Sequence, residues 1–362
     1  MNRRTFCATV ATMPVFGSVG CQTNEDDQPT PTDGTTDAPE ITVETVVDEL
    51  VVPWGVTVRE GTIFVTERPG RIQRIENETA TQVASLEDST RTGGEGGLLG
   101  LVAHPNDGSV AYTYQTYETD TGRANRILQH DISDGWSWTV LFDGIPGGTI
   151  HDGGRLFIHD DALFVTTGDA SNAGGAQNPD RLNGKILRLT LDGAPHPDNP
   201  FDNAVFTYGH RNPEGLTQRD GVLYTIEHGP DEDDEVNRLT AGGNYGWPER
   251  TGESDSEEFV DPVVTFSDII APGGGTFYDG PLGKWQGDLF LGTLAGEHLR
   301  RIRLDNDTIV ENEPLYEGEF GRLRTPFMGP DQQLCVTTSN RDGRGNPNAT
   351  DDKIIRLRAN QS

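Results

Sequence analysis

Short runs of apolar and aromatic residues recur along the chain, each of them just after a turn. They start 45 to 66 residues apart and cover residues 62–66, 110–114, 162–166, 222–226, 288–292 and 333–337. Continuous apolar character over about five residues is typical of a strand that is covered on both faces. We therefore expect six similar units between residues 46 and 357, each with an inner hairpin that contains one of these strands.

A second kind of run, in which apolar residues alternate with arginine or lysine, follows the apolar strand in several units. Its copies are residues 71–75, 185–189, 301–304 and 353–357. Period-two alternation predicts an outer strand with one face in water. No stretch has the periodicity of a substantial helix. Six units of about 50 residues predict an all-β fold, a six-bladed β-propeller of four-stranded antiparallel blades.

The hairpins determine where the unusual residues of each unit lie. Turn residues at 159–161 and 219–221 mark two of them. In a hairpin, the segment before the first strand and the segment after the second lie at the same end. One mouth of the propeller, where such folds bind ligands, should therefore collect His151, Asp169, Arg211, Asn212, residues 227–230, Arg322 and Arg324.

Charge excludes several classes of function. The 362 residues include 58 Asp and Glu against 28 Lys and Arg, which gives a net charge of −30. Phosphate backbones and anionic headgroups repel such a surface, so binding to nucleic acid or directly to a membrane is not expected. Acidic residues spread along the whole chain predict a halophilic protein, because molar salt screens their repulsion. An acidic secreted protein from ordinary salt is the alternative.

The first residues resemble an export signal rather than part of a fold. Arg3 and Arg4 precede an uncharged stretch, which predicts a twin-arginine signal over residues 1–21. The stretch ends in Ser18-Val19-Gly20-Cys21, similar to a lipoprotein cleavage box. We expect a lipid anchor at Cys21 on the cell surface, with simple cleavage as the alternative. Residues 22–43 then read as a disordered acidic tether, and residues 44–360 as the propeller.

Cysteine usage agrees with this division. Cys7 lies in the signal and Cys21 at the expected lipid site, so only Cys335 remains in the propeller. No disulfide is therefore available to the folded domain. Cys335 lies within an apolar strand, where a buried thiol is expected rather than a nucleophile.

Six motifs, in this order, resemble one family of enzymes. They are residues 53–55 (PWG), 94–100 (GEGGLLG), 151–154 (HDGG), 209–216 (GHRNPEGL), 227–230 (EHGP) and 244–248 (NYGWP). Together they are similar to the soluble glucose/sorbosone and aldose sugar dehydrogenases, which use pyrroloquinoline quinone (PQQ) and calcium. The resemblance covers roughly residues 46–358. It implies oxidation of the anomeric carbon of an aldose to a lactone, with electrons passed to an unidentified acceptor.

The resemblance also implies roles for particular residues. His151 falls on the position of the base, with Asp152 or Asp169 available to orient it. The positions that contact the cofactor, His151 included, match Glu95, Arg211, Asn212, Arg322 and Arg324. Arg211 would also stabilise negative charge on the reduced quinone. From the residues alone, a structural His151 and an Arg211 that only pins a loop remain open.

Calcium ligands follow from the same resemblance. The main-chain carbonyls of Gly229 and Pro230 match the site beside PQQ, and hard oxygen ligands suit calcium. Glu235 and the main chain of Tyr245 match a second, structural calcium site. The competing interpretation of residues 231–235 is an acidic surface typical of adaptation to salt.

The chain departs from the family pattern in two places. Glu95 stands where several members have a glutamine, so a carboxylate would face an anionic cofactor. Ala295 occupies the place of a lysine that contacts the cofactor in the glucose enzymes, and His298, Arg300 or Arg301 would have to compensate.

Two rival functions stay open. One is a calcium-dependent propeller lactonase or other hydrolase, and the other is a sugar-binding propeller without catalysis. A dinucleotide cofactor is not expected, because no glycine-rich fingerprint follows a strand and opens a helix.

Overall fold

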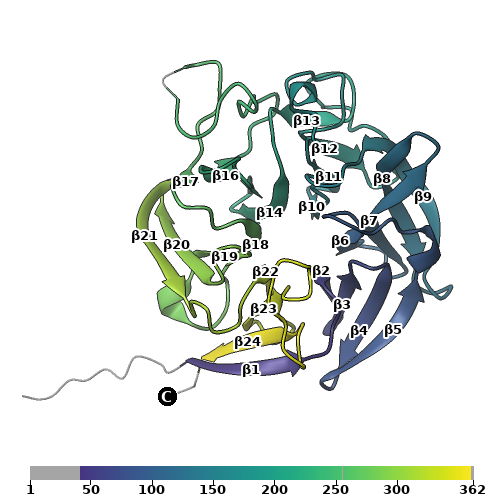
Figure 1. Ribbon diagram of the computed structural model, residues 1–362, viewed down its shortest axis with the longest axis vertical. Coiled ribbons are helices and arrows are strands. Elements are labelled where there is room, and N and C mark those ends of the chain that lie inside the picture. Colours follow the sequence, from purple (N-terminus) through teal and green to yellow (C-terminus); the bar gives the residue numbers. More distant parts are fainter. Residues whose placement is uncertain (1–40, 255, 360–362) are drawn as a thin grey trace, which may run out of the picture. The chain divides into compact units, whose positions relative to one another are not determined.

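The protein is described here by a computed structural model that covers residues 41–254 and 256–359. Within these residues the chain forms strands and three short 3₁₀ turns, η1 (Glu87–Ser89), η2 (Ala173–Gly175) and η3 (Gly283–Trp285). The strands form six four-stranded antiparallel sheets, and Figure 1 shows them arranged as blades around a central axis. The fold is the predicted six-bladed β-propeller.

Each blade runs outward from an inner strand near the axis. Blade 1 contains β2 (Pro53–Arg59), β3 (Thr62–Glu67), β4 (Arg71–Glu76) and β5 (Thr79–Ser85). Blade 2 contains β6 (Leu98–Ala103), β7 (Val110–Thr119), β8 (Gly122–Asp131) and β9 (Ser137–Pro146). Blade 3 contains β10 (Leu156–His159), β11 (Ala162–Thr167), β12 (Lys185–Thr190) and β13 (Val205–Tyr208).

The second half of the ring repeats this order. Blade 4 contains β14 (Pro213–Arg219), β15 (Val222–Glu227), β16 (Asp234–Arg238) and β17 (Val264–Phe266). Blade 5 contains β18 (Pro272–Phe277), β19 (Leu289–Thr293), β20 (Leu299–Asp305) and β21 (Thr308–Leu315). Blade 6 contains β22 (Leu323–Met328), β23 (Leu334–Thr338), β24 (Ile354–Ala359) and β1 (Ile41–Val47).

Blade 6 joins the two ends of the propeller. Its three inner strands come from the C-terminal end, and its outermost strand β1 comes from the N-terminal side (Figure 1). β1 pairs with β24 from Ile41 opposite Ala359 to Val47 opposite Ile354. The ladder therefore starts at Ile41 and closes the ring by hydrogen bonds between segments about 300 residues apart.

The hairpin prediction is confirmed, whereas one strand position was wrong. All six apolar runs lie in the second strand of a blade. The runs that alternate with arginine are third strands, not outer ones, because a further strand covers each of them. The outermost strands of the blades were missed because they share no common pattern: β5 (TATQVAS) is mostly exposed, whereas β13 (VFTY) is mostly buried.

The apolar core lies between neighbouring blades as well as within them. One cluster joins Trp54 of blade 1 with Tyr112 of blade 2 and Val165 of blade 3. Cys335 is buried and unpaired, and burial raises the pKa of its thiol to about 12. The thiol is therefore protonated at neutral pH and behaves as a small apolar residue, as expected.

The predictions for the export signal, the Cys21 anchor and most of the tether fall on residues 1–40, outside the described part of the chain. Among the described residues, none belongs to a helix of the length and hydrophobicity that a membrane span requires.

Candidate active site at the mouth of the propeller

The inner hairpins bring the predicted site residues to one mouth. β10 and β11 are antiparallel neighbours, so His151 and Asp169 meet at the end where this hairpin opens. β14 and β15 do the same for Asn212 and the segment that follows Glu227. Hydrogen bonds between neighbouring blades, such as that from the main-chain nitrogen of Gly153 to Asn212 Oδ1 (3.2 Å), join blades 3 and 4 at this mouth.

His151 is held by its ring and by its main chain. Its Nδ1 lies 2.8 Å from Oδ1 of Asp169, and the indole Nε1 of Trp247 donates to Asp169 Oδ2 over 2.8 Å. The main chain of His151 has a φ of 63°, a left-handed conformation that is rare outside glycine. Such strain concentrates at functional sites, where the surroundings must enforce it.

The Asp169 carboxylate determines which nitrogen of His151 is free. Burial raises the pKa of Asp169, but hydrogen bonds from His151, Trp247 and Ser171 outweigh burial and hold the pKa below its usual value. A charged carboxylate only accepts hydrogen bonds, so the proton of neutral His151 lies on Nδ1. Its Nε2 has no hydrogen-bond partner among the described residues and is left with a lone pair, as a base requires.

Glu95 lies between the catalytic and the cationic parts of the mouth. Its Oε2 accepts the main-chain N–H of His151 over 2.8 Å and lies 3.5 Å from Asn212 Nδ2. Its Oε1 accepts two hydrogen bonds of 3.1 Å from Arg344. Arg344, from the loop after β23, is therefore a cation that balances the charge of this carboxylate.

Asp152 does not orient His151. Its Oδ1 accepts hydrogen bonds from Asn125 Nδ2 (3.0 Å) and the main-chain nitrogen of Gly148 (2.9 Å), on the blade 2 side. Its Oδ2 is buried without a partner in the described part of the chain. Burial raises the pKa of Asp152. Of the two candidate orienting carboxylates, the structure places only Asp169 against the ring.

Arg211 and Asn212 lie next to this catalytic group. Arg211 donates from its main chain to Glu227 and from Nη1 to the carbonyl oxygen of His228 (3.3 Å). Its guanidinium lies 5.3 Å from the ring centre of Trp247, and its buried Nε has no partner among the described residues. A half-buried cation with a vacant donor suits negative charge that develops at the mouth.

Arg322 and Arg324 are buried and paired with carboxylates. Arg322 binds Asp342 through Nε and Nη2, at 2.9 and 2.8 Å, and the carbonyl of Leu294 through Nη1. Arg324 Nη1 lies 2.6 Å from Oε2 of Glu214. Both arginines therefore face the mouth already engaged in protein contacts.

A second group of buried acids lies beneath Arg211. Glu227 and Glu235 are opposite each other on β15 and β16, and Asn237 Nδ2 donates to both, at 2.9 and 3.0 Å. Burial and the charge of Glu227 raise the pKa of Glu235 to about 8. Asn237 Oδ1 is buried with no partner in the described residues. Two carboxylates and a vacant amide oxygen are a donor set that fits a hard cation such as calcium.

The Gly229 turn is folded tightly next to these acids. Its main-chain nitrogen donates to Asp234 Oδ1 over 2.9 Å. A Cβ at Gly229 would lie 1.9 Å from the carbonyl oxygen of Glu232, so only glycine fits. Gly229, Glu235 and Tyr245 line one small cavity. Within residues 41–254 and 256–359 no three His, Cys, Asp or Glu side chains form a metal cluster, and three of the four predicted ligands are main-chain carbonyls.

The basic residues near Ala295 all have protein partners already, so none of them is free to take the place of the lysine that the family has at this position. Arg301 is bound to Asp288 and Glu313, and Arg300 Nε contacts Asn312. His298 Nδ1 lies 2.8 Å from the carbonyl oxygen of Gly296. The sequence analysis did not identify Arg68, Glu214, Asp342 or Arg344, which the structure places among the site residues. Glu214 lies within the motif at residues 209–216 but was not singled out there. No local motif marks the other three, because Arg68 meets Asp342, and Arg344 meets Glu95, across long stretches of sequence.

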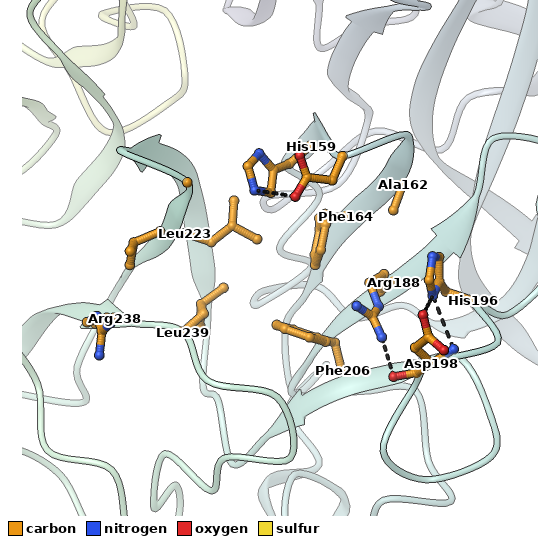
Figure 2. A pocket seen from close by; sticks show the side chains of 13 residues that line it. His159, Ala162, Phe164, Arg188, His196, Asp198, Phe206, Leu223, Arg238 and Leu239 are labelled. Atoms are coloured by element: carbon orange, nitrogen blue, oxygen red, sulfur yellow. Dashed lines mark hydrogen bonds and ion pairs between the residues drawn. The ribbon is translucent and has the colours of Figure 1, made fainter.

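Other cavities lie away from these residues. One of about 480 Å³ lies between blades 3 and 4 at the opposite end of the strands, and Figure 2 shows its lining residues. Its floor includes Phe164, Phe206 and Leu223. None of the predicted site residues lines it.

Known proteins resemble this chain along nearly all of the propeller. Aldose sugar dehydrogenase YliI of Escherichia coli (strain K12) is 28% identical, over 84% of this chain and 91% of that protein. Quinoprotein glucose dehydrogenase B of Acinetobacter calcoaceticus is 31% identical over 57% of this chain and 51% of that protein. The PQQ-bound structure of aldose sugar dehydrogenase from Streptomyces coelicolor is 36% identical, with a TM-score of 0.79, and covers 88% of this chain and 99% of that chain.

A comparison with protein families gives the same result. A sequence model described as glucose/sorbosone dehydrogenase matches residues 50–355, from just before β2 to β24. This range contains every site residue discussed above. The chain belongs to the glucose/sorbosone dehydrogenase family.

Proposed function

We propose that this protein is a PQQ- and calcium-dependent dehydrogenase that oxidises the anomeric carbon of aldoses to lactones. The observation that carries the proposal is the contact between His151 and Asp169 at the mouth, next to Arg211 and Asn212. The PQQ-bound Streptomyces coelicolor relative supports the choice of cofactor. Bound PQQ would supply a two-electron acceptor for the hydride from the sugar.

His151 would act as the base. Its Nε2 takes the proton of the anomeric hydroxyl while the hydrogen on the same carbon leaves with its electron pair, and the sugar becomes a lactone. Asp169 keeps the Nδ1 proton in place and stabilises the imidazolium that forms. Trp247 donates to the second oxygen of Asp169 and so keeps this carboxylate charged.

The remaining mouth residues would bind and polarise the cofactor. Arg211 and Asn212 offer the donors that suit the carbonyl oxygens of a quinone. The acids at Glu227 and Glu235 and the turn at Gly229 fit calcium, which would balance their charge. The direct calcium ligands beside PQQ would be the carbonyls of Gly229 and Pro230, and Glu235 with Tyr245 would hold a second ion.

Location and partners belong to the same proposal. A twin-arginine signal and a lipid anchor at Cys21 would place the propeller on the cell surface, where sugars and a diffusible or membrane-bound electron acceptor are accessible. The net charge of −30 suits a halophilic setting.

The test is steady-state turnover of the purified full-length protein in molar salt, with a panel of aldoses and an artificial dye as the acceptor. Activity should require both PQQ and calcium, and a chelator should abolish it. Turnover without PQQ, or hydrolysis of lactones at the same site, would contradict the proposal.

A further inference from the structure

The cavity of about 480 Å³ between blades 3 and 4 lies apart from the residues of the mouth. Figure 2 shows its apolar walls: Phe164 and Phe206 come from blade 3, and Leu223 and Leu239 lie on the blade 4 side. Small-molecule sites in proteins have this size, with apolar and aromatic walls and a few polar groups that orient the ligand. The polar groups of this cavity therefore indicate the kind of ligand that it fits.

Arg188 is the polar group that stands against the aromatic wall. Its Nε donates to Asn199 Oδ1 over 2.8 Å, and its Nη2 donates to the main-chain oxygen of Asp198. The guanidinium carbon lies 4.8 Å from the ring centre of Phe206. Among the described residues, Arg188 forms no salt bridge with a carboxylate, and its Nη1 has no hydrogen-bond partner. A guanidinium that is held in place but keeps free donors suits the carboxylate of a ligand.

The other charged groups of the cavity already have partners. Arg238 pairs with Asp307 over 3.5 Å. Two aspartates on the rim, Asp160 and Asp198, pair with histidines of the cavity, and their side chains are more than 80% exposed. Solvent screens these exposed carboxylates, so they repel a bound anion only weakly. Arg188 is therefore the cation that remains for an anionic ligand.

A second cavity at the same end of the strands provides an internal comparison. It has a volume of about 520 Å³, lies between blades 6 and 1, and contains Arg356. Arg188 and Arg356 occupy the same place in the third-strand pattern, which is KILRL in blade 3 and KIIRL in blade 6. The two Nη atoms of Arg356, however, bind Glu44 and Asp331 at 2.6 and 3.0 Å. Carboxylates of the protein thus take the place beside Arg356 that a ligand could take beside Arg188.

We propose that the cavity between blades 3 and 4 binds a small aromatic carboxylate. Arg188 holds the carboxylate, and the aromatic ring of the ligand lies against Phe164, Phe206 and Leu223. This site lies apart from the mouth, so its ligand does not depend on the proposed dehydrogenase activity.

Calorimetric titration of the full-length protein with naphthalene-2-carboxylate, at fixed salt, tests the proposal. This probe should bind saturably. Acetate carries the charge without the ring, and naphthalene-2-methanol carries the ring without the charge. Each of these two probes should bind at least about 10-fold more weakly, because each lacks one of the two contacts. Equal affinity for naphthalene-2-methanol, or no saturable binding of naphthalene-2-carboxylate at millimolar concentration, would overturn the proposal.

Two matched variants locate the probe. Arg188→Gln should weaken the binding of naphthalene-2-carboxylate by about 10-fold or more, the effect of a lost charge-assisted hydrogen bond, and leave that of naphthalene-2-methanol unchanged. Arg356→Gln removes the same charge from the same strand position in the other cavity, so it should bind the probe as the wild type does. Cooperative thermal unfolding of each variant verifies that a loss of affinity is not a loss of fold. Wild-type affinity in Arg188→Gln, or an equal loss in Arg356→Gln, would contradict the assignment of the site.

Discussion

Three histidine–aspartate pairs in this protein use the same residue types in different surroundings. At the mouth, His151 and Asp169 are 2.8 Å apart, and their side chains are 12% and 2% exposed. In the cavity between blades 3 and 4, His159 pairs with Asp160 at 3.3 Å (Figure 2). His196 pairs there with Asp198 at 3.9 Å, and both of these aspartates are more than 80% exposed.

The pairs differ in two ways: in whether the aspartate has a further hydrogen-bond partner, and in how far apart its two residues lie in the sequence. Asp160 and Asp198 are sequence neighbours of their histidines and lie in water. Asp169 comes from the far side of a hairpin and accepts a further hydrogen bond from Trp247. A buried carboxylate that is also held by Trp247 fixes one tautomer of its histidine. Solvent screens the interaction of an exposed carboxylate with its histidine. We therefore expect only the mouth pair to support catalysis.

Replacement of the histidine by alanine should give the largest difference in turnover between the mouth pair and the His159 pair. His151→Ala should lower sugar oxidation by about 10²- to 10⁴-fold, as loss of a general base does. His159→Ala should leave turnover unchanged, because its ring lies at the far end of the strands. Steady-state rates at saturating PQQ provide the comparison. Equal rates for both variants would show that His151 is structural.

Exchange of the carboxylates should have the next largest effect. Asp169→Asn places an amide against Nδ1 of His151 and favours the tautomer with the proton on Nε2, which is no longer a base. We expect a decrease in kcat of about 10²-fold. The same exchange at Asp198 should have no effect. An active Asp169→Asn variant would argue against the tautomer assignment.

The indole of Trp247 should set the pH at which Asp169 titrates. Trp247→Phe removes one donor to the charged carboxylate, so the pKa of Asp169 should rise. The acidic limb of the kcat profile at which Asp169 becomes protonated, well below neutral pH, should then move to higher pH, with turnover near neutrality unchanged. Trp138→Phe on the exposed face of β9 is the control. An acidic limb that stays in place would remove Trp247 from the catalytic group.

Lys185 supports the loop that carries Asp169, and its effect should be the smallest. Its buried ammonium donates to the carbonyls of Gly175, Ala176 and Asn183 at 2.7 to 3.0 Å, and burial lowers its pKa to about 7. Unfolding restores a pKa near 10.5, so the unfolded chain binds more protons between these values.

Wild-type stability should therefore rise relative to Lys185→Met as the pH increases from about 7 to 10. We expect the difference in melting temperature to change by about 5–8 °C. Arg188→Met, on the same strand near the far cavity, should show no such trend. A flat difference for Lys185→Met would mean that its ammonium keeps an ordinary pKa.

The fold was predictable because its signal repeats. Each inner hairpin carries its own apolar run and turn, and six copies support one another. The outermost strands were not predictable because they share no common pattern: β5 (TATQVAS) carries little apolar signal, whereas β13 (VFTY) is mostly buried. The closing pair of β1 and β24 depends on contacts between the two ends of the sequence, which no local pattern reports.

The site residues likewise divide into those that lie in a local motif and those that do not. His151, Arg211 and Asn212 lie in contiguous motifs and were found from them. The choice of Asp169 over Asp152 required the direction of two side chains, which the sequence does not contain. Arg68 and Arg344 have no motif, since their importance comes from neighbours that are distant in the chain.

The most direct test of the central claim is an absorbance titration of the purified protein with PQQ and calcium in molar salt, followed by glucose. If the mouth is a quinone-dependent sugar site with His151 as its base, one equivalent of PQQ binds and its quinone absorbance disappears when glucose is added. His151→Ala should bind PQQ equally but keep the quinone absorbance. A wild-type protein that binds no PQQ, or a variant that bleaches as fast as the wild type, would contradict the account.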